Sequence, residues 1–130
     1  MQLSLLTILC LMSMPVLGQK GFIGNGTSEK ENEIIKNIWS LLEVRDRANY
    51  IDNQTSGKRN LKVWIYKTPK NLKKKYYWIK VGEDNGGVYV SHFNFFVYPD
   101  NLEVKYFDTA TEQEIELSSW RKKNKNVSQQ

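Results

Sequence analysis

Four segments between residues 61 and 107 decide the fold, and they read LKVWIYK (61–67), KYYWIKV (75–81), VYVSHFNFFVY (88–98) and LEVKYF (102–107). Each is rich in β-branched and aromatic residues and repeats its pattern every second residue, which is the period of a β-strand. The clearest turn between them is Glu83-Asp84-Asn85-Gly86-Gly87, because Asn and Gly tolerate the positive φ that a hairpin turn requires. With a short fifth strand at residues 115–117, the sequence predicts an antiparallel meander of four to five strands.

The segment before the strands predicts one amphipathic helix. Ser28 and Glu31 have the spacing of a capping box, in which each side chain satisfies a backbone amide at the start of the helix. The apolar residues that follow recur every three or four positions and form one stripe. They are Ile34, Ile35, Ile38, Trp39, Leu41 and Leu42. We expect this helix to end near residues 48–51, so the fold class is α+β, with one N-terminal helix packed on a curved antiparallel sheet.

Alternation assigns the strand side chains to two faces of the sheet. The expected core face carries Leu61, Val63, Ile65, Tyr77, Ile79, Val81, Phe93, Phe95, Val97, Leu102, Val104 and Tyr106. The opposite face is aromatic and basic, and its candidate partner-binding residues are Trp64, Tyr66, Tyr76, Trp78, Lys80, His92 and Asn94. Trp and Tyr suit a docking surface because they offer a large contact area at a small loss of conformational entropy. Two readings without a binding role remain open: cross-strand pairing that stiffens the sheet, and cover by the C-terminal segment with Trp120.

The first eighteen residues, Met1–Gly18, carry no charged side chain and are mostly apolar. The apolar stretch fits the hydrophobic region of a signal peptide and is shorter than the ~20 residues of a membrane span. We therefore expect a signal peptide over residues 1–18, a mature chain from Gln19, no transmembrane anchor, and a periplasmic or extracellular location. Lipid attachment at Cys10 is the alternative, but Leu9 stands where a lipobox has a small residue.

The single cysteine, Cys10, lies inside the predicted signal peptide. Cleavage leaves a mature chain without disulfides, thiolate ligands or a thiol nucleophile. Small extracellular domains of animals are commonly stapled by disulfides, so this composition favours a bacterial periplasm or cell surface. The sequons at Asn25, Asn53 and Asn126 matter only in a eukaryotic secretory route.

The mature chain has the length of one domain, which at this size buries about 65% of the surface that its unfolded form exposes. Residues 19–27 are rich in Gly and Asn and predict a flexible leader. Residues 28–121 hold the helix and the strands and form the single α+β domain. Residues 122–130 are basic and polar, and they predict a disordered tail.

The sequence contains no recognisable constellation of catalytic or metal-ligating residues. His92 is the only histidine, and it has no cysteine or second imidazole at metal-ligand spacing. Glu83-Asp84 falls in the predicted hairpin turn, and the glutamates of residues 112–116 flank a lysine-rich region, which predicts solvated carboxylates. No glycine-rich loop leads from a strand into a helix, as a phosphate site requires. We predict no catalytic residue, no metal and no cofactor.

The net charge of +5 comes mainly from three basic clusters, at residues 58–62, 67–75 and 121–125. Such clusters can meet anionic lipid, glycan or nucleic acid. Nucleic acid is a poor partner for an exported protein, and no recognition helix or RNP-like motif accompanies the lysines, so no nucleic-acid partner is predicted. Lysine also protects edge strands from aggregation, which accounts for the clusters without a ligand.

Three segments resemble known exported domains: YWIKVGED (77–84), VSHFNFFVYP (90–99) and LEVKYFD (102–108). A long strand, a short turn and a strand ending in Asp resemble the repeat of PepSY-like and cystatin-like exported domains, although Pro99-Asp100-Asn101 lacks the glycine of the PepSY turn. Small exported proteins of Bacteroidetes are similar too, including the ending IELSSWR (115–121). The resemblance covers residues 30–121. It implies a helix wrapped by an antiparallel sheet and a non-catalytic role in binding or inhibiting a protein or peptide.

Three functional hypotheses follow from these observations. The first is an exported, non-enzymatic protein that binds a protein or peptide partner, as an inhibitor or an immunity-type antagonist of a toxin. The second is an NTF2-like pocket protein, which predicts a deep apolar cavity with inward polar groups around a small molecule. The third is a cationic surface module for anionic glycan, whose binding would depend steeply on salt.

Overall fold

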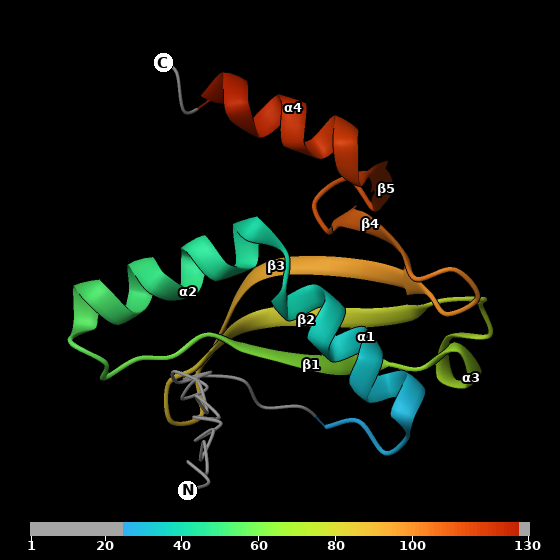
Figure 1. Ribbon diagram of the computed structural model, residues 1–130, viewed down its shortest axis with the longest axis horizontal. Coiled ribbons are helices and arrows are strands. Elements are labelled where there is room, and N and C mark those ends of the chain that lie inside the picture. The colour runs from blue at the N-terminus through green and yellow to red at the C-terminus, as the bar shows by residue number, and fades with distance from the viewer. Residues whose placement is uncertain (1–24, 128–130) are drawn as a thin grey trace, which may run out of the picture.

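The protein is described from a computed structural model, which covers residues 25–127, with side chains described through residue 125. The expected signal peptide over residues 1–18, and residues 19–24 of the expected leader, lie outside the described residues. The elements in chain order are α1 (Glu29–Trp39), α2 (Leu42–Thr55), β1 (Lys62–Lys67), α3 (Pro69–Leu72), β2 (Tyr77–Asp84), β3 (Tyr89–Tyr98), β4 (Glu103–Asp108), β5 (Gln113–Glu116) and α4 (Leu117–Val127). Figure 1 shows α1 lying across the strands of the sheet.

The strands form one antiparallel meander in the order β1-β2-β3-β4-β5. This confirms the α+β class and the meander that the sequence predicts. The predicted hairpin turn is shorter than expected, because β2 continues through Glu83 and Asp84. A register shift opposite Val81 and Gly82 marks a β-bulge in β3, and a second shift interrupts β1 between Ile65 and Lys67.

The single N-terminal helix that the sequence predicts is two helices. α1 begins as expected, because Ser28 Oγ accepts the N–H of Glu31 at 3.2 Å. It ends at Trp39, where Ser40 Oγ donates to the carbonyl oxygen of Asn37 at 2.7 Å. Such a side-chain bond competes with the helical ladder, and the chain leaves the helix although neither Pro nor Gly marks the break.

The second helix changes the direction of the chain and extends past the predicted end. Leu41 is extended, with φ −62° and ψ 134°, so α2 starts at an angle to α1 (Figure 1). α2 ends at Thr55, where Ser56 and Gly57 both take a positive φ. A left-handed residue after the last turn is a common way for a helix to stop.

The hydrophobic core lies between the helices and one face of the sheet. Side chains from α1, α2 and every strand except β5 are buried there, and α4 adds one tryptophan. The buried members are Ile34, Ile35, Ile38, Val44, Ile51, Leu61, Val63, Ile65, Ile79, Val81, Phe95, Val97, Val104 and Trp120. All twelve strand residues predicted for the core face belong to this set or pack against it, because strict alternation leaves only one face for them.

The C-terminal segment forms a helix where the sequence predicts a disordered tail. Residues 122–127 belong to α4, and residues 128–130 lie outside the described residues. Trp120 anchors this helix, because its ring stacks on Tyr106 at 4.5 Å and meets Phe95 edge-on at 5.8 Å. Since these rings belong to the core face, the reading in which Trp120 covers the opposite face is wrong.

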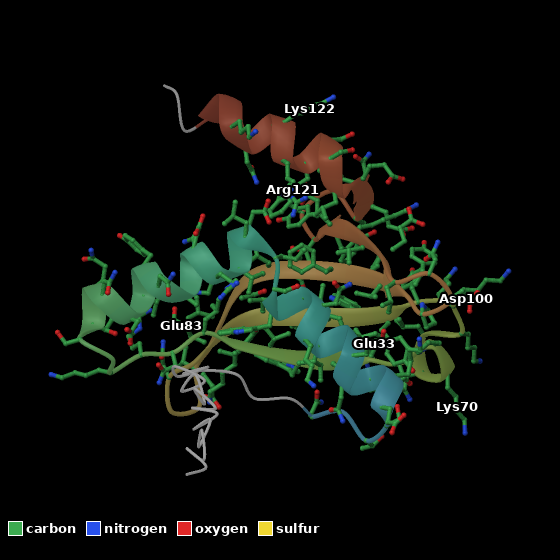
Figure 2. All side chains as sticks on the ribbon, viewed as in Figure 1. Glu33, Lys70, Glu83, Asp100, Arg121 and Lys122 are labelled. Carbon is green, nitrogen blue, oxygen red and sulfur yellow. The ribbon has the colours of Figure 1, made fainter. Side chains whose placement is uncertain are left out.

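Charged side chains lie mostly at the periphery of the fold. Lys70, Asp100 and Lys122 are exposed, whereas Glu83 lies inside (Figure 2). Within residues 25–127, none of the helices combines the length and the apolar character that crossing a bilayer requires.

Candidate functional site

Aromatic rings from four strands lie together on the sheet face opposite the core, which we call the aromatic face. Trp78 of β2 meets Tyr66 of β1 edge-on at 4.8 Å and Phe107 of β4 at 5.2 Å. Phe96 of β3 stacks on Phe107 at 4.4 Å. These contacts make one row of rings across the sheet, which ends in Tyr66 with 44% of its surface exposed.

Polar side chains hold the rings of this face in fixed orientations. The indole Nε1 of Trp78 donates to Asn94 Oδ1 at 2.9 Å, and Asn94 Nδ2 donates to Ser91 Oγ at 3.2 Å. The ammonium group of Lys80 lies 3.8 Å from the centre of the Tyr66 ring, a cation–π distance. A surface that is ordered before binding loses less entropy when a partner docks.

Three tyrosines surround the row and keep their hydroxyl protons over a wide pH range. Burial raises the pKa of Tyr89 to about 12. Burial, and then the charge of Glu114, raises the pKa of Tyr76, whose ring stacks on Phe96 at 4.2 Å. Burial also raises the pKa of Tyr98, whose hydroxyl donates to Glu114 at 2.7 Å. These groups are hydrogen-bond donors at physiological pH.

Charge is distributed unevenly across the aromatic face. Lys62 and Lys80 lie on the strands at one side, β1 and β2, whereas Glu114 and Glu116 lie on β5 at the other side. Lys105 of β4 pairs with Glu116 at 3.4 Å. The face therefore has a basic side, an aromatic centre and an acidic side.

His92 does not join the aromatic face, so its predicted place there is wrong. Val81 pairs with Phe93, and Gly82 pairs with Ser91, which leaves His92 as the extra residue of the bulge. A bulge changes the direction of its side chain relative to simple alternation. The imidazole Nε2 instead lies 2.7 Å from Glu83 Oε2.

Glu83 is fully buried, in contrast to the solvated carboxylate that the sequence predicts. Arg59, from the loop between α2 and β1, donates from Nε to Oε1 at 2.7 Å and from a terminal nitrogen to Oε2 at 2.8 Å. Burial opposes ionisation of this carboxyl, but hydrogen bonds and charge from Arg59 and His92 outweigh it and lower the pKa of Glu83. The three side chains join the base of the β2–β3 hairpin to the loop after α2.

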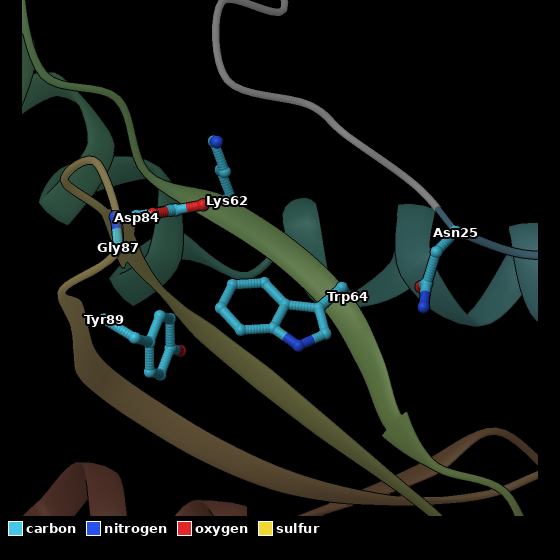
Figure 3. A pocket seen from close by; sticks show the side chains of 6 residues that line it. All are labelled: Asn25, Lys62, Trp64, Asp84, Gly87 and Tyr89. Atoms are coloured by element: carbon cyan, nitrogen blue, oxygen red, sulfur yellow. Dashed lines mark hydrogen bonds between the residues drawn. The ribbon is translucent and has the colours of Figure 1, made fainter.

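An open hollow of about 510 Å³ lies at the β1 side of the aromatic face (Figure 3). The rings of Trp64 and Tyr89 meet edge-on at 4.6 Å in its wall. Asn25, Lys62, Asp84 and Gly87 line the rest.

A second open cleft, of about 740 Å³, lies between α2 and α4 on the helix side. Its aromatic lining is Phe93, Tyr106 and Trp120, with Tyr50 on the wall from α2. The guanidinium of Arg47 lies 5.6 Å from the centre of the Phe93 ring.

Six of the seven candidate residues lie where the sequence predicts them. Trp64, Tyr66, Tyr76, Trp78, Lys80 and Asn94 are on or beside the aromatic face. The prediction overlooked Phe96 and Phe107, although alternation places both opposite the predicted core residues of their strands. Alternation could have found these two, whereas the hollow and the cleft depend on tertiary packing.

No group of three or more His, Cys, Asp or Glu side chains is placed to hold a metal ion in the described part of the chain. Comparisons with protein families, with curated proteins and with solved structures find no match to this chain. Its function is therefore inferred from its own geometry.

Proposed function

We propose that the protein is an exported, non-enzymatic binding protein that engages a protein or peptide partner through the aromatic face. The observation that carries the proposal is the row of rings from Tyr66 to Phe107 on the face opposite the core. Interfaces between proteins are enriched in such aromatic residues at their centre. Export rests on the apolar segment Met1–Gly18.

The charge pattern indicates what surface the partner presents. Lysines lie at the β1 side and glutamates at the β5 side of the row. A partner with an apolar centre between an acidic and a basic rim would match it, and complementary rims raise association rates and fix orientation. Inhibition of an enzyme or antagonism of a toxin is the form of binding that we favour, because the resemblance to cystatin-like domains implies such a role.

The cleft between α2 and α4 supports a second candidate, binding of a small molecule, although this cleft is open and is not the deep cavity between sheet and helix that the NTF2-like hypothesis predicts. Its aromatic lining with polar groups at the wall is typical of small-molecule sites. This site lies on the helix side, so it shares no residue with the aromatic face.

Two exposed tyrosines allow a matched test of the two candidates. Tyr66 lies on the aromatic face with 44% of its surface exposed, and Tyr50 lines the cleft with 60% exposed. The partner would be isolated from envelope extract with Gln19–Gln130 as bait, and its affinity for each variant measured by calorimetry. We expect Tyr66→Ser to weaken binding about tenfold or more and Tyr50→Ser to leave it unchanged.

The opposite result would refute docking on the aromatic face and favour the cleft. Affinity that is equal in both variants and collapses with salt would instead indicate a glycan held by the lysines. Thermal melts of both variants establish that each is folded.

A further inference from the structure

The chain contains two Asn-Gly pairs, Asn25-Gly26 and Asn85-Gly86, and their surroundings differ. An asparagine that precedes glycine can lose its side-chain amide, because the backbone nitrogen of the glycine reaches the side-chain carbonyl carbon and no side chain hinders the approach. The two atoms must come to about 3–3.5 Å from each other. The freedom of the asparagine side chain and of the local backbone therefore sets the rate of this reaction.

Contacts on both residues hold Asn25-Gly26 in place. Asn25 Oδ1 accepts the N–H of Ile65 at 2.8 Å, and Asn25 Nδ2 donates to the Ile65 carbonyl oxygen at 3.1 Å. Gly26 lies so close to α1 that a Cβ atom built on it would be only 2.9 Å from the backbone nitrogen of Asn32. Ring closure at this pair therefore requires that both hydrogen bonds of the Asn25 side chain break first.

Asn85-Gly86 lies in the turn between β2 and β3, where both residues are exposed. Gly86 and Gly87 take a positive φ of 70° and 100°. Beyond the adjacent residues, no atom of the described chain lies within 4 Å of a Cβ built on either glycine. The turn therefore has open space for the movement that ring closure requires.

The hydrogen bonds that close this turn leave the reacting groups free. The N–H of Asn85 donates to the carbonyl oxygen of Val88 at 2.9 Å, and the N–H of Gly87 donates to Asp84 Oδ1 at 3.3 Å. Within the described part of the chain, no hydrogen bond engages the side-chain amide of Asn85 or the N–H of Gly86.

We propose that Asn85 is a site of spontaneous deamidation in the folded protein, whereas Asn25 is protected. The nitrogen of Gly86 bonds to the side-chain carbonyl carbon of Asn85, and the amide nitrogen leaves as ammonia with the proton that Gly86 gives up. The succinimide that forms takes up one water molecule and opens to aspartate or isoaspartate. Water is the only co-reactant, and nothing is oxidised or reduced.

Deamidation changes the border of the hollow at the β1 side of the aromatic face. Asp84 and Gly87 of the same turn line this hollow together with Lys62 (Figure 3). The product adds a second carboxylate next to Asp84, and isoaspartate also lengthens the backbone of the turn by one methylene group. The charge of this border therefore becomes more negative as the protein ages, without the action of an enzyme.

The test uses the protein from Gln19 to Gln130, which contains every described residue, with no partner present. Folded protein is incubated in mildly alkaline buffer, and mass spectrometry follows the conversion of Asn to Asp in the trypsin fragments 21–30 and 81–105. We expect Asn85 to convert about tenfold faster than Asn25 or more, because Asn25 reacts only after its hydrogen bonds open.

Two controls separate the effect of the fold from that of the sequence. In guanidinium chloride, where both pairs are unfolded, we expect Asn25 and Asn85 to convert at similar rates. Asn101 lies in the same trypsin fragment as Asn85, but it precedes Leu102 and its Oδ1 accepts the N–H of Glu103 at 2.9 Å. We expect no conversion of Asn101 in the folded protein.

Conversion of Asn25 at the same rate as Asn85 in the folded protein would overturn the proposal. Conversion of Asn85 in guanidinium chloride but not in the folded protein would also overturn it, because the turn would then prevent ring closure. A difference between the two pairs that persists in guanidinium chloride would refute protection by the fold. None of these outcomes involves a partner, so the result stands apart from the proposed function.

Discussion

Phe95 and Phe96 are neighbours in β3 and point to opposite faces of the sheet. Phe95 is fully buried among core side chains, including the rings of Tyr106 and Trp120. Phe96 is only 5% exposed, although it lies on the face away from the core, because the rings of Tyr76, which precedes β2, and of Phe107 in β4 stack on it. The helices cover the core face of the sheet. On the aromatic face, the rings are buried by neighbouring rings of the same face.

This difference shows how a sheet can keep an ordered aromatic surface without covering it. Lateral contacts bury Phe96, whereas Trp78 and Phe107 stay partly exposed and Tyr66 is 44% exposed, so these three rings present surface to a partner. The same contacts stabilise the sheet, so cross-strand pairing and a binding role are compatible at this face.

The largest effect should come from removing the ring of Phe95. Phe95→Ala leaves a cavity under the helices and should lower the free energy of unfolding by about 4 kcal/mol. Phe96→Ala should cost about 2 kcal/mol, because water and neighbouring rings can fill the gap from the open side. Urea denaturation followed by circular dichroism measures both, and equal losses would show that the aromatic face acts as a second core.

The buried carboxylate of Glu83 should give the next largest effect. Glu83→Gln removes the charge that Arg59 and His92 share and should destabilise the fold by about 2–3 kcal/mol at pH 7. The pKa of Glu83 is lowered in the folded state, so this stabilisation is complete above the unfolded-state pKa of about 4.3 and is lost as the pH falls through the folded pKa.

The difference in the free energy of unfolding between the parent protein and Glu83→Gln should therefore become smaller below about pH 4.3. Chemical denaturation at a series of pH values measures this difference. If this difference in the free energy of unfolding stays constant down to the lowest pH of the series, the charge of Glu83 contributes no stability.

A smaller effect is expected on the aromatic face from the bond between Trp78 and Asn94. Trp78→Phe keeps a ring but removes the indole donor, and it should cost about 1 kcal/mol beyond the change in ring size. A double-mutant cycle with Asn94→Ala isolates the coupling between the two side chains. Zero coupling would mean that packing alone orients the indole.

The smallest effect should come from the ion pair between Glu43 of α2 and Arg121 of α4. Burial raises the pKa of Glu43, but the hydrogen bonds and charge of Arg121 outweigh it, and the net pKa is lowered. Arg121 is partly exposed, so solvent screens the pair, and Glu43→Gln should cost about 0.5 kcal/mol or less. A loss above about 1 kcal/mol in urea denaturation would show that this pair holds α4 to the helix layer.

The sequence predicts the faces of the sheet well because a single physical rule governs them. Val63, Ile79 and Phe95 point to the core, and Trp64 points away from it, as strict alternation requires. The same rule fails at His92, because one extra residue in the strand shifts the alternation, and no residue type signals that bulge. The sequence predicts Glu83 in the hairpin turn, because turn-forming residues follow it directly. In the structure Glu83 belongs to β2.

The helices were harder to delimit from the sequence. The break at Ser40 has no Pro or Gly, and the helical pattern of apolar residues continues through it, so local signals favour one helix. The polar segment after Trp120 has little apolar character of its own. The helix α4 depends on the packing of Trp120 against Tyr106. This is a tertiary contact, which the spacing of apolar residues along the sequence cannot predict.

The bulge at His92 also makes β3 tolerant of a change in chain length at one position. Ser91 faces Gly82 and Phe93 faces Val81, so excision of His92 would join two residues that already sit in consecutive rungs of the ladder. Every remaining side chain of the strand would keep its side, whereas a deletion near Phe95 would turn half of the strand over. A deletion scan of β3 should find its permissive site at this histidine, at the expense of one contact to Glu83.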